Sequence, residues 1–531
     1  MKGFIRIKIH IIFSSVFIIF LSSFFIIVLY NQKKEIYNNN NILEIHEYEL
    51  NNNTITFNED NIEDNDNTNN VNEKIIEDYA RINDNIQEEF DNIALRFIFN
   101  EIENEIEVDN FLKLRDRMEL HTALWHSIFG KYDPSDEDEK YPLELYKEKL
   151  INESSFLVDD NIYGITGKKK VLAHLHQHLY PWFYYNRYNS LSDLIQTSQG
   201  RGIVICTGHK HFRYARSTID SLRNVLNCTL PIQVFYNGND DLPVEEQDIL
   251  WKYDNISVDD ISYYFDNQAI NIEGWAIKPF AVLASKFEEV IIIDADVVYL
   301  HDPEELFDNK NYQKTGTIFF RDRTLYPGIN HRVRWLHYWM EDPLPESKNT
   351  RFYNYETIYE MDSSTVVIHK TKTLLGLLTT CKLNEGNIRT EVVYKVVHGD
   401  KETFWMGYDM ARQHYYLNTL PCVFVGNVTS GEVCGHVGHV LDNVFYYWNG
   451  HIVKNKDYED DLELVQFNGY HFESNETEWK KDLSCLLYND TQPIYFSEEE
   501  QSTFNKILER ERINHFIIKN NTLSDNNLNN L

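Results

Sequence analysis

The stretch FEEVIIIDADVVYLHDPEELF, residues 287–307, decides the expected fold of this chain. Residues 291–293 are β-branched isoleucines, and such an apolar run predicts a buried central strand. The run ends at Asp294 and Asp296, two carboxylates one residue apart. Since ligands of open α/β sheets bind at the carboxyl ends of the strands, we expect both carboxylates at a binding edge.

Two hard oxygen donors this close can hold one divalent cation and leave coordination positions open for a diphosphate. We therefore predict that Asp294 and Asp296 form the metal site of a sugar-nucleotide enzyme. The alternative is an ordinary turn whose acidic residues cap the next helix. Asp302 and Pro303 already supply a cap and a first helical position, which makes that alternative weaker.

Short apolar runs alternate with helical patterns ahead of this stretch. The predicted strands are GIVICTG at 202–208, LPIQVFYNG at 230–238, residues 255–258 and the run that ends at Asp294. Alternating strands and helices imply a central mostly parallel sheet with right-handed crossovers. With two carboxylates at the end of its last strand, this sheet resembles the nucleotide-binding half of a GT-A-like α/β fold. Neither GxGxxG nor GxxxxGK[ST] follows the first strand, so the usual dinucleotide and P-loop signatures are missing.

The amino-terminal segment predicts a membrane anchor. Residues 11–30 carry no charge and are long enough to span a bilayer core, and the preceding Lys2, Arg6 and Lys8 favour a cytoplasmic amino terminus. A cleavable signal peptide is the alternative, although the run exceeds a normal h-region and no small-x-small site follows it. We expect a single-pass type II protein whose catalytic domain is lumenal.

Composition divides the chain into six predicted segments. They are a cytoplasmic tail (1–10), a transmembrane signal anchor (11–30), a disordered Asn- and Asp-rich stem (31–72), a helical accessory region (73–198), the GT-A-like catalytic domain (199–497), and a helix with a disordered tail (498–531). The stem has too few apolar residues to offset chain entropy. The formal net charge of −33 argues against a nucleic-acid partner, since phosphate backbones need basic surfaces.

Two further features fit a lumenal location. The six cysteines can form disulfides in an oxidising compartment, and proximity in the sequence favours a pair between Cys422 and Cys434. Glycosylation sequons occur at Asn152, Asn227, Asn255, Asn427, Asn475 and Asn489. Histidines at 174, 176 and 178 are expected to pack in the accessory region rather than to bind a metal.

Three motifs carry a resemblance to a known family. They are WAIKPFAVLASKFEEVIIIDADVVYLHDPEELF from Trp275, TGTIFFRDR from Thr315 and GDKETFW from Gly399. In this order they resemble the fungal Golgi α-mannosyltransferases, over about residues 200–457. The resemblance implies transfer of mannose from GDP-mannose onto mannose-ended glycans in the secretory lumen. TGTIFFRDR is more similar to the α-1,3 branch than to the α-1,2 branch.

The resemblance also implies site residues. Lys278 matches the lysine of an A-I-K segment and is expected to contact a donor phosphate or sugar hydroxyl. Asp400 is expected beside the mannose, and Glu402 either joins it or caps a helix. His439 is expected to complete the metal site with Asp294 and Asp296, and His436 and His451 are the alternatives in the same segment.

MDSSTVVIHK, residues 361–370, resembles the family strand E-S-G-x-V-V-I-D-K that lines the sugar site. Asp362 and Ser363 keep its polar groups, whereas Ser364 replaces a glycine and His369 replaces an aspartate. Two more donor-binding candidates come from position alone. Thr207 ends the first strand and is placed for the base or ribose, or as a helix cap, and Arg216 lies on the first helix as a possible phosphate contact or a surface cation.

These expectations combine into one hypothesis, a retaining, metal-dependent α-1,3-mannosyltransferase of the Golgi membrane. The expected partners are GDP-mannose, Mn²⁺ and mannose-terminated N- or O-linked glycans. The alternatives are an α-1,2-mannosyltransferase of the same family and an inactive lumenal glycan-binding protein on the same fold. We expect a front-face mechanism in which the departing phosphate takes the acceptor proton, and double displacement with Asp400 as nucleophile stays open.

Overall fold

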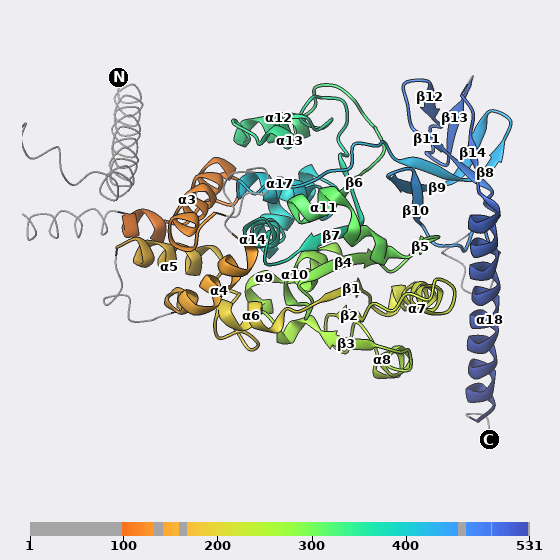
Figure 1. The fold of residues 1–531 in the computed structure, drawn as a ribbon, viewed down its shortest axis with the longest axis horizontal. Coiled ribbons are helices and arrows are strands. Elements are labelled where there is room, and N and C mark those ends of the chain that lie inside the picture. The colour runs from red at the N-terminus through yellow and green to blue at the C-terminus, as the bar shows by residue number, and fades with distance from the viewer. Residues whose placement is uncertain (1–97, 132–141, 159–166, 455–462, 490, 529–531) are drawn as a thin grey trace, which may run out of the picture. The chain divides into compact units, whose positions relative to one another are not determined.

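The computed structural model describes residues 98–131, 142–158, 167–454, 463–489 and 491–528, with side chains described as far as residue 515 (Figure 1). The predicted cytoplasmic tail, anchor and stem lie outside these residues. Within the described ranges, no helix has the length and apolar character needed to cross a membrane.

A six-stranded sheet lies at the centre of the catalytic region, in the order β3-β2-β1-β4-β7-β6. Its strands are β1 (Arg201–Cys206), β2 (Ile232–Tyr236), β3 (Ile256–Asp260), β4 (Glu289–Asp294), β6 (Thr317–Arg321) and β7 (Met361–His369). β1 to β4 are parallel, and β7 runs antiparallel to both β4 and β6. All four strands expected from the sequence are present. The sheet is mixed rather than fully parallel because β7 begins at the edge where β6 ends and runs in the opposite direction.

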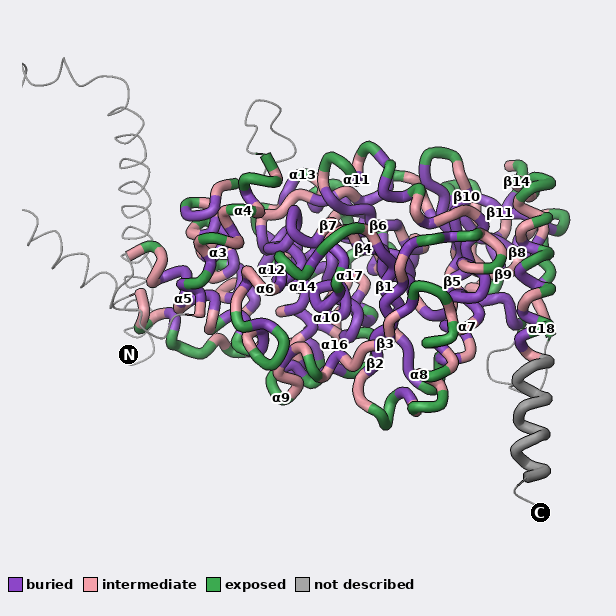
Figure 2. The backbone as a smooth tube through the Cα atoms, turned by 60° about the horizontal axis from the view of Figure 1, so that its bottom comes forward, coloured by how far each residue is buried: buried purple, intermediate pink, exposed green. Residues whose placement is uncertain are grey.

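Helices cover the sheet, and a first group of helices precedes β1 in the chain. The first group comprises α3 (Phe111–Phe129), α4 (Leu143–Glu153), η1 (Ser154–Val158), α5 (Gly167–Leu179) and α6 (Leu191–Thr197). Between the first strands lie α7 (His209–Asn224), α8 (Val244–Leu250), η3 (Ile261–Tyr263), α9 (Asn267–Ile270), η4 (Gly274–Ala276) and α10 (Ile277–Ala284). Every residue of α10 is buried, and Figure 2 shows the buried tube concentrated in α10, α14 and the sheet strands.

The later helices follow β4 in the chain. They are η5 (Pro303–Asp308), α11 (Lys310–Thr315), α12 (His331–Trp339), α13 (Pro345–Lys348), α14 (Leu374–Leu383), α15 (Gly386–Ile388), η6 (Arg389–Val393), α16 (Tyr394–Val396), α17 (Lys401–Met410) and α18 (Glu498–Leu528). α18 runs to Leu528 and so covers most of the segment 498–531, for which the sequence predicted a helix and a disordered tail. Arg510 fixes this helix to α7 through an ion pair with Asp220.

The helical region before β1 shares one hydrophobic core with the catalytic region. The Trp182 ring lies 5.1 Å from the Phe280 ring of α10, and the Thr122 hydroxyl donates to the Ala411 carbonyl at 3.0 Å. His176 is fully buried, and one ring nitrogen lies 3.0 Å from a ring nitrogen of His121. His176 is thus packed in the core, whereas His178 of the same helix is exposed to solvent.

A second, antiparallel sheet follows, which the sequence analysis did not resolve into strands. It contains β5 (Val297–Tyr299), β8 (Val423–Thr429), β9 (Glu432–Leu441), β10 (Val444–Asn449), β11 (Gly469–Phe472), β12 (Thr477–Trp479), β13 (Cys485–Tyr488) and β14 (Ile494–Tyr495). β10 pairs with β5, so that Asn449 lies opposite Val297. This pairing brings the end of β10 next to the Asp294–Asp296 turn.

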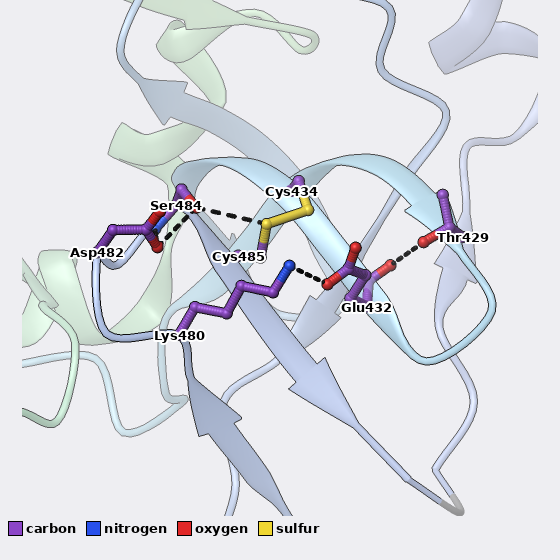
Figure 3. Close-up of a disulfide and its surroundings, with 7 residues drawn as sticks. All are labelled: Thr429, Glu432, Cys434, Lys480, Asp482, Ser484 and Cys485. Atoms are coloured by element: carbon purple, nitrogen blue, oxygen red, sulfur yellow. Dashed lines mark hydrogen bonds and ion pairs between the residues drawn. A yellow bond between two sulfur atoms is a disulfide. The ribbon is translucent and has the colours of Figure 1, made fainter.

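The disulfide in this sheet corrects one prediction. Cys434 on β9 is bonded to Cys485 on β13, whereas Cys422 is a buried free thiol (Figure 3). The register of β9 and β13 places Cys434 directly opposite Cys485. The pairing of Cys422 with Cys434 was wrong because closeness in the sequence does not reveal which strands become neighbours.

Removal of this disulfide should weaken the fold. The bond links residues 51 positions apart, and cross-links over loops of this size contribute about 2–5 kcal/mol. We expect Cys434→Ser/Cys485→Ser to lower the free energy of unfolding by that amount in a denaturant titration. Cys422→Ser is the control that keeps the disulfide. Thiol titration of the unreduced, denatured chain should find four free thiols, and two free thiols would contradict the assignment.

Candidate active site

The carboxyl edge of the central sheet holds the Asp294 turn. Asp294 pairs with Cys206 of β1, and β7 flanks β4 on its other side. The Thr218 hydroxyl of α7 lies 2.8 Å and 2.9 Å from the carbonyl oxygens of Ala295 and Val297. This contact fixes the turn from the α7 side.

The second sheet fixes the same turn from the other side. The backbone N–H groups of Gly450 and His451 donate to the carbonyl oxygen of Asp296 at 3.2 Å and 2.6 Å. His451 has a left-handed backbone with φ of 66° and a side chain that is buried against the Tyr214 ring at 4.9 Å. The segment after β10 therefore lies against the Asp294–Asp296 turn and holds its backbone in place.

Lys278 gathers several of the predicted site residues around its ammonium group. Its Nζ lies 3.0 Å from Oδ1 of Asp294 and 3.1 Å from Oδ2 of Asp400. The same Nζ donates to the Ser363 hydroxyl at 2.8 Å and to the Ser363 carbonyl at 3.1 Å. The Ser363 hydroxyl donates to Asp400 at 3.2 Å. Four residues from four separate segments thus form one polar cluster, in which Lys278, Ser363 and Asp400 are buried and Asp294 keeps 26% of its side chain exposed.

Burial and charge together set the protonation of this cluster. Burial raises the pKa of Asp294 to about 7. The attraction of Lys278 lowers this pKa, but repulsion from Asp296 and Asp400 opposes that attraction. Burial also raises the pKa of Asp400, against the attraction of Lys278. For Lys278, burial works to lower the pKa, but the two carboxylates outweigh it and raise the pKa above its usual value. Lys278 therefore keeps its charge at neutral pH.

The donor set at this edge fits a hard divalent cation. Asp294 and Asp296 offer carboxylate oxygens and repel one another, and Lys278 is paired with Asp294 and with Asp400. The expected trio with His439 is not assembled, however. In the part of the chain that the structure describes, the one trio of closely spaced ligand atoms is Glu432, Cys434 and Cys485, and its two cysteines are bonded to each other.

His439 contacts Asp362 rather than Asp294 or Asp296, and this corrects its expected role as a metal ligand. Its Nε2 lies 2.7 Å from Oδ2 of Asp362, and only 2% of the residue is exposed. Burial favours a higher pKa for Asp362, but the hydrogen bond and charge of His439 dominate and lower the pKa well below its usual range. Of the three candidate histidines, His451 is the one whose backbone contacts the Asp296 turn.

Ser364, one of the two departures from the family strand, supports Asp362. The Ser364 hydroxyl and N–H donate to the Asp362 carboxylate at 2.6 Å and 3.2 Å. The other departure, His369, lies at the opposite end of β7, where it pairs with Glu289. Neither substitution removes a polar group from the Asp294 edge.

Glu402 does not join Asp400. The Glu402 carboxylate accepts hydrogen bonds from the Glu360 N–H at 3.0 Å and from the Trp405 indole at 2.6 Å, and the residue is fully buried. Burial raises its pKa to about 8, against the attraction of Lys401. Both carboxylate oxygens therefore bind the protein itself, and the expected catalytic role of Glu402 is replaced by a structural one.

The structure places Thr207 and Arg216, the two candidates chosen by position, in different surroundings. Thr207 ends β1 at the same edge as Asp294, and its hydroxyl lies 3.3 Å from the Gly208 carbonyl. Arg216 instead interacts with Tyr253 and Glu511, on the side of α7 that faces α18. Because these partners engage the guanidinium on that side of the helix, the expected phosphate contact of Arg216 is not supported.

One residue of this edge was missed. Asp322 follows β6, forms an ion pair with Lys401, and interacts electrostatically with Asp362. Its position in TGTIFFRDR, directly after an apolar strand, is the same signal that identified Asp294. The strand-end rule applied to every strand would have found it.

An α/β sheet with Asp294 and Asp296 at its carboxyl edge, and with Lys278 paired to Asp294 and Asp400, is the arrangement that the sequence analysis expected of a GT-A-like fold. Residues 200–441 match the protein family described as "Mannosyltransferase putative". Over 336 residues the chain is 28% identical to "Putative alpha-1,3-mannosyltransferase MNN15" of Candida albicans, covering 49% of this chain and 42% of that protein. These matches confirm the resemblance to the fungal α-1,3-mannosyltransferase family that the sequence motifs indicate.

A second relative is "Alpha-1,3-mannosyltransferase MNN1" of Saccharomyces cerevisiae, 26% identical over 272 residues, covering 42% of this chain and 35% of that protein. Among solved structures, the mannosyltransferase Ktr4p of S. cerevisiae aligns with 56% of this chain and 84% of its own, at 10% identity and a TM-score of 0.28. The matched regions span about two fifths of the length of these two curated relatives.

Proposed function

We propose that this protein is a retaining α-1,3-mannosyltransferase that transfers mannose from GDP-mannose to mannose-terminated N- or O-linked glycans. The observation that carries the proposal is the cluster of Lys278, Asp294, Ser363 and Asp400, inside the segment 200–441 that matches the family described as "Mannosyltransferase putative". A nucleotide-sugar enzyme needs its leaving diphosphate neutralised and its sugar held, and this cluster has groups for both tasks.

Asp294 and Asp296 would hold a divalent cation, with Mn²⁺ our choice. His451 contacts their turn through its backbone, whereas the expected ligand His439 contacts Asp362. The cation would stabilise the negative charge of the departing diphosphate. Lys278 would add its positive charge at the same place, and its pairing with Asp294 and Asp400 holds the two carboxylates in fixed positions.

Asp400 would stabilise positive charge at the anomeric carbon of the mannose. One of its oxygens accepts from Ser363 and the other is paired with Lys278, so both are engaged. A carboxylate held in this way is a weak nucleophile, which favours the front-face mechanism over double displacement. Asp362, oriented by His439 and Ser364, would bind sugar hydroxyl groups.

The cellular setting is also a proposal. We place the protein in the Golgi membrane as a single-pass type II protein with a lumenal catalytic domain. The disulfide between Cys434 and Cys485 supports an oxidising compartment, and the relatives in fungi support protein glycosylation as the process.

Linkage analysis tests the proposed activity. Purified full-length protein would be incubated with GDP-mannose, Mn²⁺ and an α-linked mannose disaccharide, and the trisaccharide product would be analysed by methylation and NMR. We expect an α-linked mannose on O3 of the acceptor. Attachment to O2 would place the protein in the α-1,2 branch instead, and binding of the disaccharide without any transfer would support the inactive glycan-binding alternative.

A further inference from the structure

Four aromatic side chains form a connected row that the proposed chemistry does not use. We call Trp275, His398, Tyr359 and Tyr326 the aromatic rim. The ring centroids lie 5.2 Å apart between Trp275 and His398, 6.2 Å between His398 and Tyr359, and 6.4 Å between Tyr359 and Tyr326. The residues come from η4, from the segment between β6 and β7, and from the segment before α17.

The aromatic rim begins next to the Lys278 cluster. A Cβ placed on Gly399 would lie 2.9 Å from the Trp275 ring, so the indole rests on the backbone immediately before Asp400. Trp275 also precedes Lys278 by three residues on the same helical segment. Farther along, the Lys401 ammonium lies 3.9 Å from the centre of the Tyr359 ring.

Trp275 and Tyr326, the two end members of the aromatic rim, expose their rings to solvent, which is unfavourable for large apolar groups. Trp275 is 53% exposed and Tyr326 is 61% exposed, although large aromatic residues usually bury most of their surface. Tyr326 has φ of 55°, a left-handed conformation that is unusual for a bulky residue. Exposed rings in a row that reaches the Lys278 cluster at Trp275, together with the strained backbone of Tyr326 at the far end, indicate a binding function.

Tyr326 and Tyr359 are held by the segment that joins β6 to β7. β6 ends at Arg321 and β7 begins at Met361, and these two residues pair at the same sheet edge that carries Asp294. The segment therefore starts and finishes beside the Asp294 edge. A ligand on the aromatic rim would approach Asp400 from outside the cluster.

We propose that the aromatic rim is the acceptor subsite, on which successive pyranose rings of a mannose-terminated glycan stack by their C–H faces. The inference rests on the proposed function and names where its acceptor binds. Three consecutive ring contacts extend farther than one nucleobase, so the row suits a chain of sugars better than the guanine of the donor. Lys401, whose ammonium lies over the Tyr359 ring, and the exposed His398 supply polar groups beside the rings for sugar hydroxyls.

The test compares Trp275→Ala and Tyr326→Ala with Trp251→Ala. Trp251 is 52% exposed and caps the carboxyl end of α8, where the chain leads into β3 at the opposite sheet edge, so it is a matched control. Steady-state kinetics would vary GDP-mannose and an α-linked mannose disaccharide separately. We expect each rim variant to raise KM for the disaccharide about tenfold, with KM for GDP-mannose unchanged. Trp251→Ala should match wild type.

Binding without turnover gives the second readout. Saturation-transfer NMR of the disaccharide, recorded without donor, should show contact with wild type and Trp251→Ala but lose it in Trp275→Ala. An unchanged KM for the disaccharide in both rim variants of an active enzyme would overturn the inference, and so would a rise in KM for GDP-mannose alone. If wild type transfers no mannose yet Trp275 is still required for disaccharide binding, the proposed activity fails while the aromatic rim stands as a glycan site.

Discussion

Asp294→Ala and Asp296→Ala should each lower the rate of mannosyl transfer by at least about 100-fold while leaving the thermal melting temperature near that of wild type. The rate falls because the leaving diphosphate loses its main source of charge stabilisation. Stability changes little because Lys278 keeps its contacts with Asp400 and Ser363, and because removing one of several neighbouring carboxylates relieves repulsion.

Transfer assays and melting curves on the same preparations would measure both effects. Asp308→Ala is the control, since this carboxylate has 74% of its side chain exposed and lies at the end of η5. Chelation of wild type should reproduce the loss, and added Mn²⁺ should restore wild type but not the Asp294→Ala/Asp296→Ala double variant. Near-normal transfer by a well-folded Asp294→Ala protein would show that the active site lies elsewhere.

Lys278→Met should lose both activity and stability. The substitution leaves the buried Asp400 and the partly exposed Asp294 without their cation, and removing one partner of a buried pair such as Lys278 and Asp400 costs about 3–5 kcal/mol. Denaturant unfolding should show this loss, and transfer should become undetectable in the fraction that folds. Lys286→Met, which removes the same charge from an exposed position, should stay within about 0.5 kcal/mol of wild type.

A double variant separates the two consequences. Lys278→Met/Asp400→Asn should recover part of the lost stability, because the amide that replaces the Asp400 carboxylate carries no charge to leave unpaired, yet the variant should remain inactive. If the two substitutions instead add fully in their effect on unfolding, Lys278 and Asp400 do not interact as a buried pair.

The features that the sequence predicted correctly are local. Four strands follow from apolar runs bounded by turn residues, and the strand-end rule placed Asp294 at the sheet edge where Lys278, Ser363 and Asp400 gather. Each of these features depends on a residue's own segment and on the fact that parallel strands end at a common edge.

The errors concern long-range pairing and helix geometry. The pairing of β9 with β13 determined the disulfide, and the pairing of β10 with β5 brought His451, rather than His439, to the Asp296 turn. No local pattern encodes those neighbours. Glu402 is a different case, because residues two positions apart at the start of a helix point to different sides, so it could not have joined Asp400.

Donor selectivity tests the central claim most directly. Purified full-length protein would be supplied with Mn²⁺, an α-linked mannose disaccharide and, in separate reactions, GDP-mannose, GDP-fucose, UDP-glucose, UDP-galactose or UDP-N-acetylglucosamine, each with and without chelator. The account predicts a trisaccharide from GDP-mannose, at a rate at least about 100-fold above every other donor and abolished by chelation. Efficient transfer from a UDP-sugar, or transfer from GDP-mannose that persists in chelator, would contradict it.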